Sequence, residues 1–216
     1  MLGTHDLLIF IFAGWLLNVT PGPDTALIVA RSTQLGLRGG VAAVAGVGCG
    51  IMVHVTAASL GISALIAASA TAFAVVKFCG AAYLVYIGAR MMLTRRAREN
   101  LEAATAGIAP EMSFATVLRK GFVTNALNPK VALFFLAFLP QFVDPDKGHV
   151  GLQAAVLGVV WVLIATVCDA VWAIGSGSLV GLLRTSARAR RIERRASGGI
   201  LIGLGVLATL AHPAKR

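Results

Sequence analysis

Acidic, basic and histidine side chains lie inside long apolar stretches of this sequence, at Asp24, His54, Lys130 and Asp169. An ionisable group near the centre of a lipid bilayer costs a few kcal/mol on insertion scales and usually faces a bundle interior or a water-filled cavity. A functional role is therefore the default hypothesis for each of these residues. Two carboxyl groups and an ammonium group could together bind a zwitterion or carry a proton.

The depth of each side chain in its apolar stretch helps to separate these roles. About 22 Å of continuous helix lie between Asp169 and Arg184, so the short Asp169 side chain cannot reach a water interface. We expect Asp169 to exchange a proton or to contact substrate, with a structural ion pair as the alternative. For His54 the two interpretations are equally favoured, because a neighbouring hydroxyl or carbonyl can satisfy a neutral imidazole.

Proline interrupts two of the apolar stretches beside these charges, in the motifs NVTPGPD (residues 18–24) and NALNPK (residues 125–130). Proline has no N–H to donate and disfavours helical geometry in the residue before it, while glycine permits almost any backbone torsion. Carbonyls left unpaired at membrane depth are tolerated only where protein or water satisfies them. We therefore expect two broken helices, with binding or coupling residues at Asn18, Pro21, Gly22, Pro23, Asp24, Asn125, Asn128, Pro129 and Lys130.

The helix that starts after each break has free N–H groups and a partial positive charge, which can hold a carboxylate. A kink without a ligand is the structural alternative. The motifs occupy corresponding positions in the two halves of the chain, because aligning Pro23 with Pro129 superposes PDTALIV on PKVALFF. Two corresponding breaks, each with a charge, favour the binding role.

The same alignment places Asp24 opposite Lys130. Three arrangements follow: a direct ion pair acting as a gate, Asp24 on a substrate ammonium with Lys130 on its carboxylate, or one of the two charges tuning Asp169. A zwitterionic amino acid fits the second arrangement.

The composition predicts that membrane helices carry these residues. Hydrophobic residues make up 57% of the 216 residues, charged residues 13%, and the mean hydropathy is +0.83. A hydrocarbon core of about 30 Å requires around 20 apolar residues per helix. Such stretches occur at residues 7–29, 40–67, 70–93, 121–143, 150–183 and 196–211. We therefore expect an all-α membrane protein with six transmembrane helices, of which the first and fourth are broken.

Three spans in each half make the halves enter the membrane from opposite sides, which is the arrangement of inverted-topology repeats. We expect a single integral membrane domain over residues 1–216. It comprises a first repeat at 1–93, a cytoplasmic loop at 94–112 and a second repeat at 113–216.

Basic residues cluster in alternate connections between the expected spans, at residues 30–39, 90–120 and 184–195. Lys and Arg accumulate in cytoplasmic loops, so we expect these connections in the cytoplasm and both termini outside. The net charge of +10 would favour a nucleic-acid partner in a soluble protein. Membrane topology already accounts for the charge, so no nucleic-acid partner is expected.

Cys49, Cys79 and Cys168 lie singly, without the paired spacing of a redox or zinc motif, so no metal site and no cofactor are expected. The glycine spacing in GVGCG (residues 46–50) and GILIG (residues 199–203) is typical of close helix packing. Packing within the bundle is the favoured interpretation of both motifs, and a homodimer that packs through them is the alternative.

The segments NVTPGPDTALIVARSTQLGLRGGVAAVAGVGCG and FVTNALNPKVALFFLAFLPQFV resemble the two signature regions of the LysE/RhtB family of bacterial amino-acid exporters. The resemblance covers essentially the whole chain in length, span order and loop placement. It implies a multi-pass protein of the bacterial inner membrane that exports amino acids or derivatives such as homoserine, its lactone, threonine or basic amino acids. It also implies that the proton gradient drives export. At the level of residues it extends to Pro21, Gly22, Pro23, Asp24, Asn125, Asn128, Pro129 and Lys130, and many relatives have asparagine at the position of Asp24.

We therefore expect substrate to bind between the two broken helices during alternating access, with protonation of Asp169 or Asp24 as the coupling step. The expected partners are an amino-acid substrate, protons and the lipid bilayer, and no catalytic residue is assigned. An intramembrane enzyme using His54, Asp169, Ser176 and Ser178 is one alternative, although no nucleophile motif places these residues together. A thiol electron carrier of similar six-helix fold is another, and it would need two facing cysteines.

Overall fold

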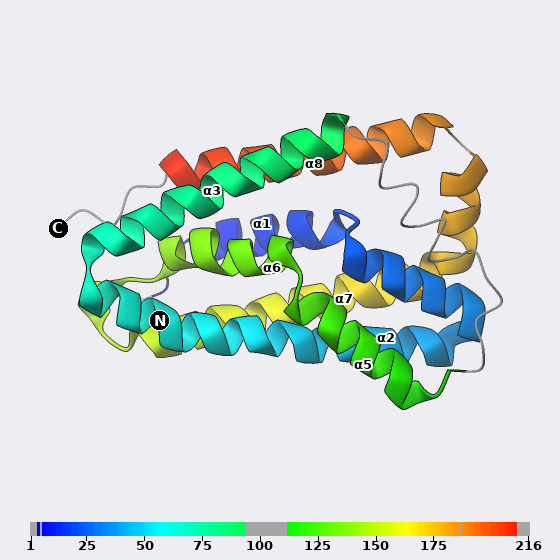
Figure 1. The fold of residues 1–216 in the computed structure, drawn as a ribbon, viewed down its shortest axis with the longest axis horizontal. Helices are drawn as coiled ribbons and strands as arrows, with labels where there is room; N and C mark the ends of the chain where they lie inside the picture. Colours follow the sequence, from blue (N-terminus) through cyan, green and yellow to red (C-terminus); the bar gives the residue numbers. More distant parts are fainter. Residues whose placement is uncertain (1–3, 5, 94–111, 186, 211–216) are drawn as a thin grey trace.

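The computed structural model describes residues 4, 6–93, 112–185 and 187–210 (Figure 1). The described residues form helices joined by short connections, and no strand occurs among them. The expected cytoplasmic loop lies outside the described residues except for Met112, and so do both chain ends. In chain order the elements are α1 (Leu7–Val19), α2 (Pro23–Ala68), α3 (Ala70–Leu93), α5 (Phe114–Ala126), α6 (Pro129–Leu133), η1 (Phe134–Phe138), η2 (Leu139–Phe142), η3 (Pro145–Lys147), α7 (Val150–Thr185) and α8 (Ala187–Leu210).

The first break lies where the sequence predicts it, between α1 and α2. Helix α1 ends at Val19, and Thr20 has the extended torsions φ −69° and ψ 113°. Helix α2 then begins at Pro23, a position that suits proline because the first turn of a helix needs no N–H donor. The apolar stretch over residues 7–29 is therefore two helices joined by a short non-helical segment.

The second break, also predicted, separates α5 from α6. Helix α5 ends at Ala126, and α6 begins at Pro129 with Asn128 as its N-cap. After the single turn of α6 the chain widens into the π-helix η1 and then tightens into the 3₁₀-helix η2. The second broken segment is thus irregular beyond its break, and π-helical turns are frequent at functional sites.

Helix α2 reverses direction at Gly36, which the sequence analysis does not predict. We expected a connection over residues 30–39, yet helix continues on both sides of this one residue. Gly36 has φ 66° and ψ −162°, torsions that are open essentially to glycine alone. Figure 1 shows the chain reaching the right-hand end in this region and returning along the lower edge. One glycine therefore replaces the expected loop.

The helices pack in pairs that join the two halves of the chain. Helix α2 packs on α5 and α7, α1 packs on α7, and α3 packs on α8. In Figure 1, α3 and α8 lie along the top, α2, α5 and α7 lie below, and α1 and α6 lie between them. The centre of the core contains Phe10, Phe134, Phe138 and Trp161, all almost fully buried.

Glycine permits the close crossing of α2 and α5. A Cβ atom at Gly46 would clash with the carbonyl of Leu118, and one at Gly121 would lie 2.7 Å from the carbonyl oxygen of Ala43. The GVGCG motif therefore packs inside the bundle, as favoured. A Cβ atom added to either glycine of GILIG would meet no atom of the described residues within 4 Å, so this motif does not mediate such packing here. The homodimer stays a prediction.

Among the described residues, two segments are long and apolar enough to cross a membrane, Pro23–Ile62 of α2 and Val150–Ser176 of α7. A bent pair, Phe114–Ala126 with Pro129–Phe142, adds a third if it forms one span, its two parts being inclined at 43°. The all-helical class is confirmed. Six transmembrane helices arranged as inverted repeats stay a prediction.

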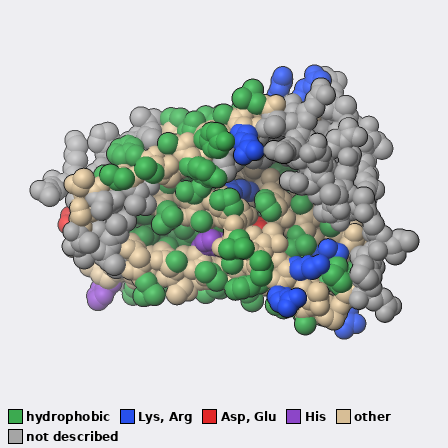
Figure 2. Space-filling model, in the orientation of Figure 1, with side chains coloured by type: hydrophobic (Ala, Val, Ile, Leu, Met, Phe, Trp, Pro, Cys, Tyr) green, Lys and Arg blue, Asp and Glu red, His purple; other side chains and the backbone are tan. Residues whose placement is uncertain are grey.

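The outer surface agrees with a lipid environment. Leu163, Val167, Val171 and Ile174 follow one another along α7 and are all more than half exposed. Figure 2 shows hydrophobic side chains over much of the visible face, with Lys and Arg mainly toward the right-hand part. An apolar surface of this extent is typical of a membrane or protein contact.

Candidate functional site

A small cavity lies where the two breaks meet. Helices α1, α2, α5, α6 and α7 all contribute to it, so both halves of the chain form its walls. Its free volume of about 10 Å³ has room for one water molecule. It is lined by Asn18, Gly22, Asp24, Thr25, Val47, Ile51, Asn125, Lys130, Val131, Trp161 and Asp169.

The structure brings most of the predicted site residues to this cavity. Asn18, Gly22, Asp24, Asn125, Lys130 and Asp169 line it directly. Pro21, Pro23 and Pro129 shape the backbone of the two breaks, while Asn128 and His54 contact lining residues without lining the cavity themselves.

Asp24, in the first turn of α2, accepts hydrogen bonds from both asparagines of the second break. Its Oδ2 accepts from Nδ2 of Asn125 at 2.9 Å and from Nδ2 of Asn128 at 2.7 Å. Its other oxygen, Oδ1, is buried and has no partner among the described residues. One carboxylate oxygen therefore ties the two halves together, and the other remains available at the cavity.

Lys130, in the first turn of α6, binds the backbone at the end of α1. Its Nζ donates to the carbonyl oxygens of Leu17 at 2.9 Å and of Thr20 at 2.8 Å. In a continuous helix the carbonyl of Leu17 would accept from residue 21, but Pro21 has no N–H. The Lys130 ammonium group thus replaces the donors that the break removes.

The direct Asp24–Lys130 ion pair, one of the three predicted arrangements, is not formed here. Within the described part of the chain the recorded ion pair is Lys147 with Asp144, at 3.3 Å. Asp24 instead accepts hydrogen bonds from two asparagine amides, and Lys130 donates to two backbone carbonyls. Unpaired carbonyls near a proline break therefore compete successfully for the ammonium group.

Asp169, on α7, also faces the cavity and is 5% exposed. Across the residues that the structure describes, its carboxyl group has neither a hydrogen bond nor an ion pair. The structural alternative weighed for Asp169, an ion pair, has no partner in this conformation. The site therefore holds two carboxyl groups in different surroundings, one hydrogen-bonded by amides and one without a donor.

His54 lies behind the cavity and contacts the second break. Its Nε2 lies 2.9 Å from the carbonyl oxygen of Asn125, and its ring is nearly parallel to that of Phe135. Because a carbonyl only accepts, the Nε2 nitrogen carries the hydrogen in this contact. This contact is the one expected under the structural interpretation, in which a carbonyl satisfies the imidazole, and it connects His54 through Asn125 to Asp24.

The polar side chains of the first break bond backward along their own helix. Asn18 Nδ2 donates to the carbonyl of Gly14 at 2.8 Å, and Thr20 Oγ1 donates to that of Leu16 at 2.8 Å. Neither side chain of this break reaches the other half, so the links across the site come from Asp24, Lys130 and the two asparagines of the second break.

Sequence reasoning missed the walls of the cavity, above all Trp161. This residue is 1% exposed, and its indole Nε1 is buried without a partner among the described residues. Val47, Ile51 and Val131 supply the apolar lining. A tryptophan in the middle of an apolar stretch was the available signal, because a membrane tryptophan usually lies at an interface where water satisfies its N–H.

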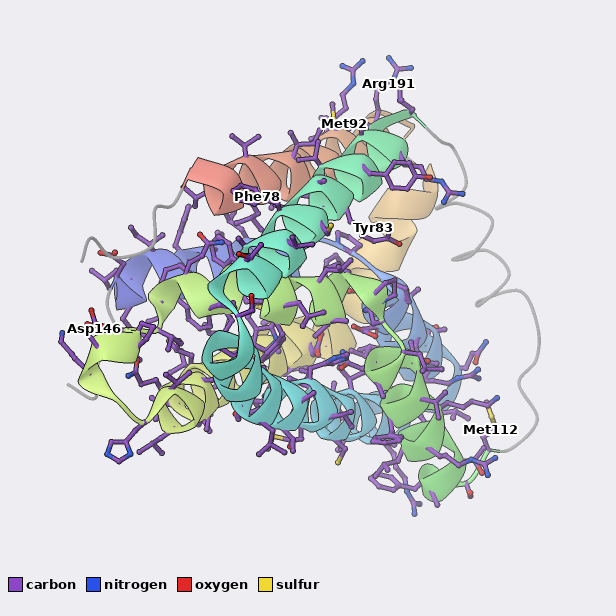
Figure 3. All side chains as sticks on the ribbon, turned by 60° about the vertical axis from the view of Figure 1, so that its left-hand side comes forward. Phe78, Tyr83, Met92, Met112, Asp146 and Arg191 are labelled. Atoms are coloured by element: carbon purple, nitrogen blue, oxygen red, sulfur yellow. The ribbon has the colours of Figure 1, made fainter. Side chains whose placement is uncertain are left out.

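A larger hollow of about 490 Å³ lies beside the Gly36 turn of α2 and the start of α5. Its lining includes Leu35, Arg38, Ala42, Met112 and Val117. Figure 3 labels Met112 at this end and Asp146 at the opposite end of the molecule. The hollow therefore lies at the end of the molecule to which the basic connections were assigned. Along α2 it is separated from the small cavity by the residues between Ala42 and Val47.

Among the described side chains, those of the alternative functions show no second site. Ser176 Oγ donates to the carbonyl of Ala173 on its own helix at 2.9 Å, and the side chain of Ser178 lies outside the described ones. Cys49, Cys79 and Cys168 are free thiols. In the part of the chain that the structure describes, no group of His, Cys, Asp and Glu is arranged to hold a metal ion.

Comparison with known proteins gives a consistent result. A membrane protein of Vibrio cholerae, uncharacterized by name, is 33% identical over 96% of this chain and 98% of its own length. One of Pseudomonas aeruginosa is 31% identical over 96% of this chain and 97% of its own length. The leucine efflux protein of Salmonella choleraesuis is 29% identical over 89% of each chain. No solved structure matches the chain.

The family model for the LysE type translocator matches residues 15–212, which include both breaks and every residue that lines the cavity. This match covers most of the chain and agrees with the resemblance found in the two proline motifs. The chain belongs to the family of LysE type translocators.

Proposed function

We propose that this protein is a secondary active exporter of amino acids or their derivatives. The observation that carries the proposal is the cavity between the two breaks, where carboxyl, amide and ammonium groups from both halves converge. Discontinuous helices that line a polar site are the usual way for secondary transporters to build a substrate site. The translocator family and the relatives named leucine efflux protein support the same class of function.

The hydrogen-bond donors and acceptors that the site leaves unused suit a zwitterion. Asp24 Oδ1 has no donor among the described residues and can accept from a substrate ammonium group. The Lys130 ammonium group has three N–H donors, of which two are used on carbonyls, so one remains for a substrate carboxylate. This is the second of the arrangements predicted from the sequence, with both charges also held to the protein.

The lining favours a neutral aliphatic amino acid such as leucine over lysine or arginine. Val47, Ile51 and Val131 supply the aliphatic part of the wall. Burying a second ammonium or a guanidinium group against them would cost several kcal/mol without a partner. Homoserine and threonine carry no such charge and belong to the same test set.

Alternating access between two inverted repeats accounts for the closed cavity. Several helix pairs correspond when the halves are exchanged: α2–α5 with α7–α1, α2–α3 with α7–α8, and α3–α8 with itself. A cavity with room for one water molecule must widen before an amino acid enters. Rocking of one half against the other would open it toward each side of the membrane in turn.

Asp169 is the proposed proton carrier. A buried carboxylate without a donor is costly, and uptake of a proton removes that cost. The titratable and charged groups that share its surroundings are Asp24, Lys130 and Cys168, with His54 behind them. Asp24 already has two amide donors, so we assign the coupling proton to Asp169 and the substrate ammonium to Asp24.

The proposed location is the bacterial inner membrane, with the end that carries the basic connections in the cytoplasm. Arg38 and Met112 line the larger hollow at this end, which makes it the entry side for a cytoplasmic substrate. Both termini would then lie on the outer side.

Counterflow in proteoliposomes tests the proposed function. Vesicles loaded with unlabelled leucine, threonine, homoserine, lysine or arginine receive a trace of the labelled compound, and protein-free vesicles are the control. We expect accumulation of leucine above the control. Failure of all five compounds under an imposed pH gradient as well would rule out amino-acid export.

The variant Asp169→Asn tests the coupling step. Without a group to protonate, we expect transport driven by a pH gradient to fall at least 10-fold, while counterflow, which needs no gradient, is retained. Undiminished gradient-driven transport in this variant would remove Asp169 from the mechanism.

A further inference from the structure

We propose that Trp161 is a specificity-determining residue whose indole N–H binds the carboxylate of the transported amino acid. This inference rests on the proposed function and adds a substrate contact that neither the proline motifs nor the family assignment supplies. It predicts that the site requires a free α-carboxylate, so that amino acids are preferred over amines, alcohols and lactones of the same side chain.

The first observation is a coincidence of unsatisfied groups. Asp24 Oδ1, Asn125 Oδ1 and Trp161 Nε1 are each buried without a hydrogen-bond partner among the described residues. All three residues line the same small cavity. Buried polar atoms are rarely left unpaired, and each exception requires an explanation. Three exceptions around one cavity indicate that it is built for a ligand with complementary groups.

The chemistry of the three atoms defines that complement. Two of them, on Asp24 and Asn125, accept hydrogen bonds, and the indole nitrogen only donates. A ligand must therefore offer N–H donors to the two acceptors and an acceptor to the indole N–H. An α-amino acid does both, with its ammonium group toward Asp24 and Asn125 and its carboxylate toward Trp161. One water molecule can take this place while the cavity is closed, since the free volume is about 10 Å³.

The second observation is that the packing around Trp161 holds its ring in place. Its ring lies 4.0 Å from that of Phe134 and 5.6 Å from that of Phe135, measured between ring centroids. On α1 the position facing the indole is Gly14, where a Cβ atom would lie 3.3 Å from the indole Cε3 and Cζ3 atoms. The ring is therefore closely packed on these sides, and the cavity that it lines offers the space for an acceptor.

The third observation is the neighbourhood of Lys130. Lys130 lines the same cavity, and its ammonium group keeps one N–H beyond the two that bind backbone carbonyls. A carboxylate placed between Lys130 and Trp161 would accept from both, which makes its hydrogen bonds charge-assisted and strong. In this arrangement Lys130 supplies the positive charge that attracts the carboxylate, and the Trp161 N–H fixes the orientation of the carboxylate.

The test is a comparison of two ligands in two variants. The probes are leucine and leucinol, which keeps the ammonium group and side chain but has an alcohol in place of the carboxylate. Each competes against labelled leucine in counterflow, with wild-type protein and with Trp161→Phe, which keeps an aromatic ring and removes the N–H. Trp172→Phe is the matched control, because it makes the same change on the same helix away from the cavity.

We expect Trp161→Phe to weaken leucine about 10-fold to 100-fold, as for a lost hydrogen bond to a charged group, and leucinol less than about 3-fold. We expect Trp172→Phe to change neither. Equal losses for both ligands, or no loss for leucine, would overturn the inference and reduce Trp161 to a packing or water-binding role. Failure of the wild-type protein to exchange leucine would instead overturn the proposed function as well.

A second replacement covers the case in which phenylalanine disturbs the fold. Benzothienylalanine at position 161 has sulfur in place of the N–H and keeps the size of the indole. We expect an unchanged thermal unfolding midpoint with the same selective loss for leucine. An unchanged midpoint with unchanged leucine affinity would overturn the inference.

Discussion

The two breaks in this molecule solve the same problem in different ways. At the first break, the carbonyls of Leu17 and Thr20 rely on Lys130 from the other half. At the second break, Asn128 caps its own helix by accepting from the Lys130 N–H at 3.0 Å. The second break is therefore capped by its own residue, with a further hydrogen bond from His54 of the first half to the carbonyl of Asn125. The first break instead depends on the Lys130 ammonium group of the second half.

This difference teaches how the halves are coupled. The donors at the site come mainly from the second half, through Asn125, Asn128 and Lys130, and the first half supplies the acceptors, Asp24 and the end of α1. The first break is therefore expected to lose its geometry whenever the second moves away. Substitutions at Lys130, Asn128, Asp24 and His54 test this dependence.

Replacing Lys130 removes the N–H donors with which the second half satisfies the backbone carbonyls at the end of α1. Lys130→Met keeps an unbranched side chain, one heavy atom shorter, but leaves two carbonyls without their ammonium donor. We expect the free energy of unfolding to fall by about 2 to 4 kcal/mol and leucine counterflow to fall more than 10-fold. Lys147→Met is the control, because Lys147 is exposed and should cost less than about 0.5 kcal/mol. Equal stability of the two variants in detergent would contradict the dependence.

Asn128 separates local capping from the link between halves. Asn128→Ala loses both the cap on α6 and the bond to Asp24, so we expect a loss of about 2 kcal/mol in unfolding free energy. Asn128→Ser can cap the helix but cannot donate an amide N–H to Asp24. We therefore expect its free energy of unfolding to be about 1 kcal/mol higher than that of Asn128→Ala. Chemical denaturation of both variants measures the difference. If serine were no better than alanine, local satisfaction of the second break would be the wrong description.

Asp24→Asn tests how much of the first break's role depends on charge. The amide keeps an acceptor oxygen for Asn125 and Asn128 but makes weaker hydrogen bonds than a carboxylate. We expect about 1 kcal/mol of destabilisation and a several-fold loss of leucine counterflow. Asp24→Ala should lose more of both. Identical losses in the two variants would mean that the acceptor oxygen contributes nothing without its charge.

His54 should have the smallest effect, because its hydrogen bond reaches the site only through Asn125. His54→Gln keeps a side-chain N–H that can reach the carbonyl of Asn125, and we expect a change below about 0.5 kcal/mol. His54→Ala removes the donor and should cost about 1 kcal/mol while lowering leucine affinity without changing the pH dependence of transport. A shifted pH profile in His54→Gln would instead assign a proton to this residue.

The sequence predicts the breaks well because their cause is local. Proline lacks an N–H wherever it lies, so Pro21 and Pro129 mark the ends of helices without reference to the rest of the fold. The convergence of Asp24, Lys130 and Asp169 also follows from their unsuitability for lipid. These predictions needed only the chemistry of single residues and their spacing.

The partners of those residues were not predictable in the same way. Opposite charges at aligned positions favour a pair, but the competition between Asp24 and the carbonyls before Pro21 for Lys130 depends on distances that the sequence does not contain. The reversal at Gly36 was hidden because a single residue in a glycine-rich, polar segment takes the place of a loop. Trp161 was hidden because its role depends on which helices surround it.

The crossing of α2 and α5 has a mechanical consequence. At Gly46 and Gly121 the two backbones touch with no side chain between them. At such a contact the two helices cannot slide along each other, because any shift along either helix brings a side chain against the opposite backbone. We expect it to behave as a fulcrum, a point that stays in place while the ends of both helices swing. Its position between the larger hollow and the small cavity means that a modest tilt about this point changes the width of both.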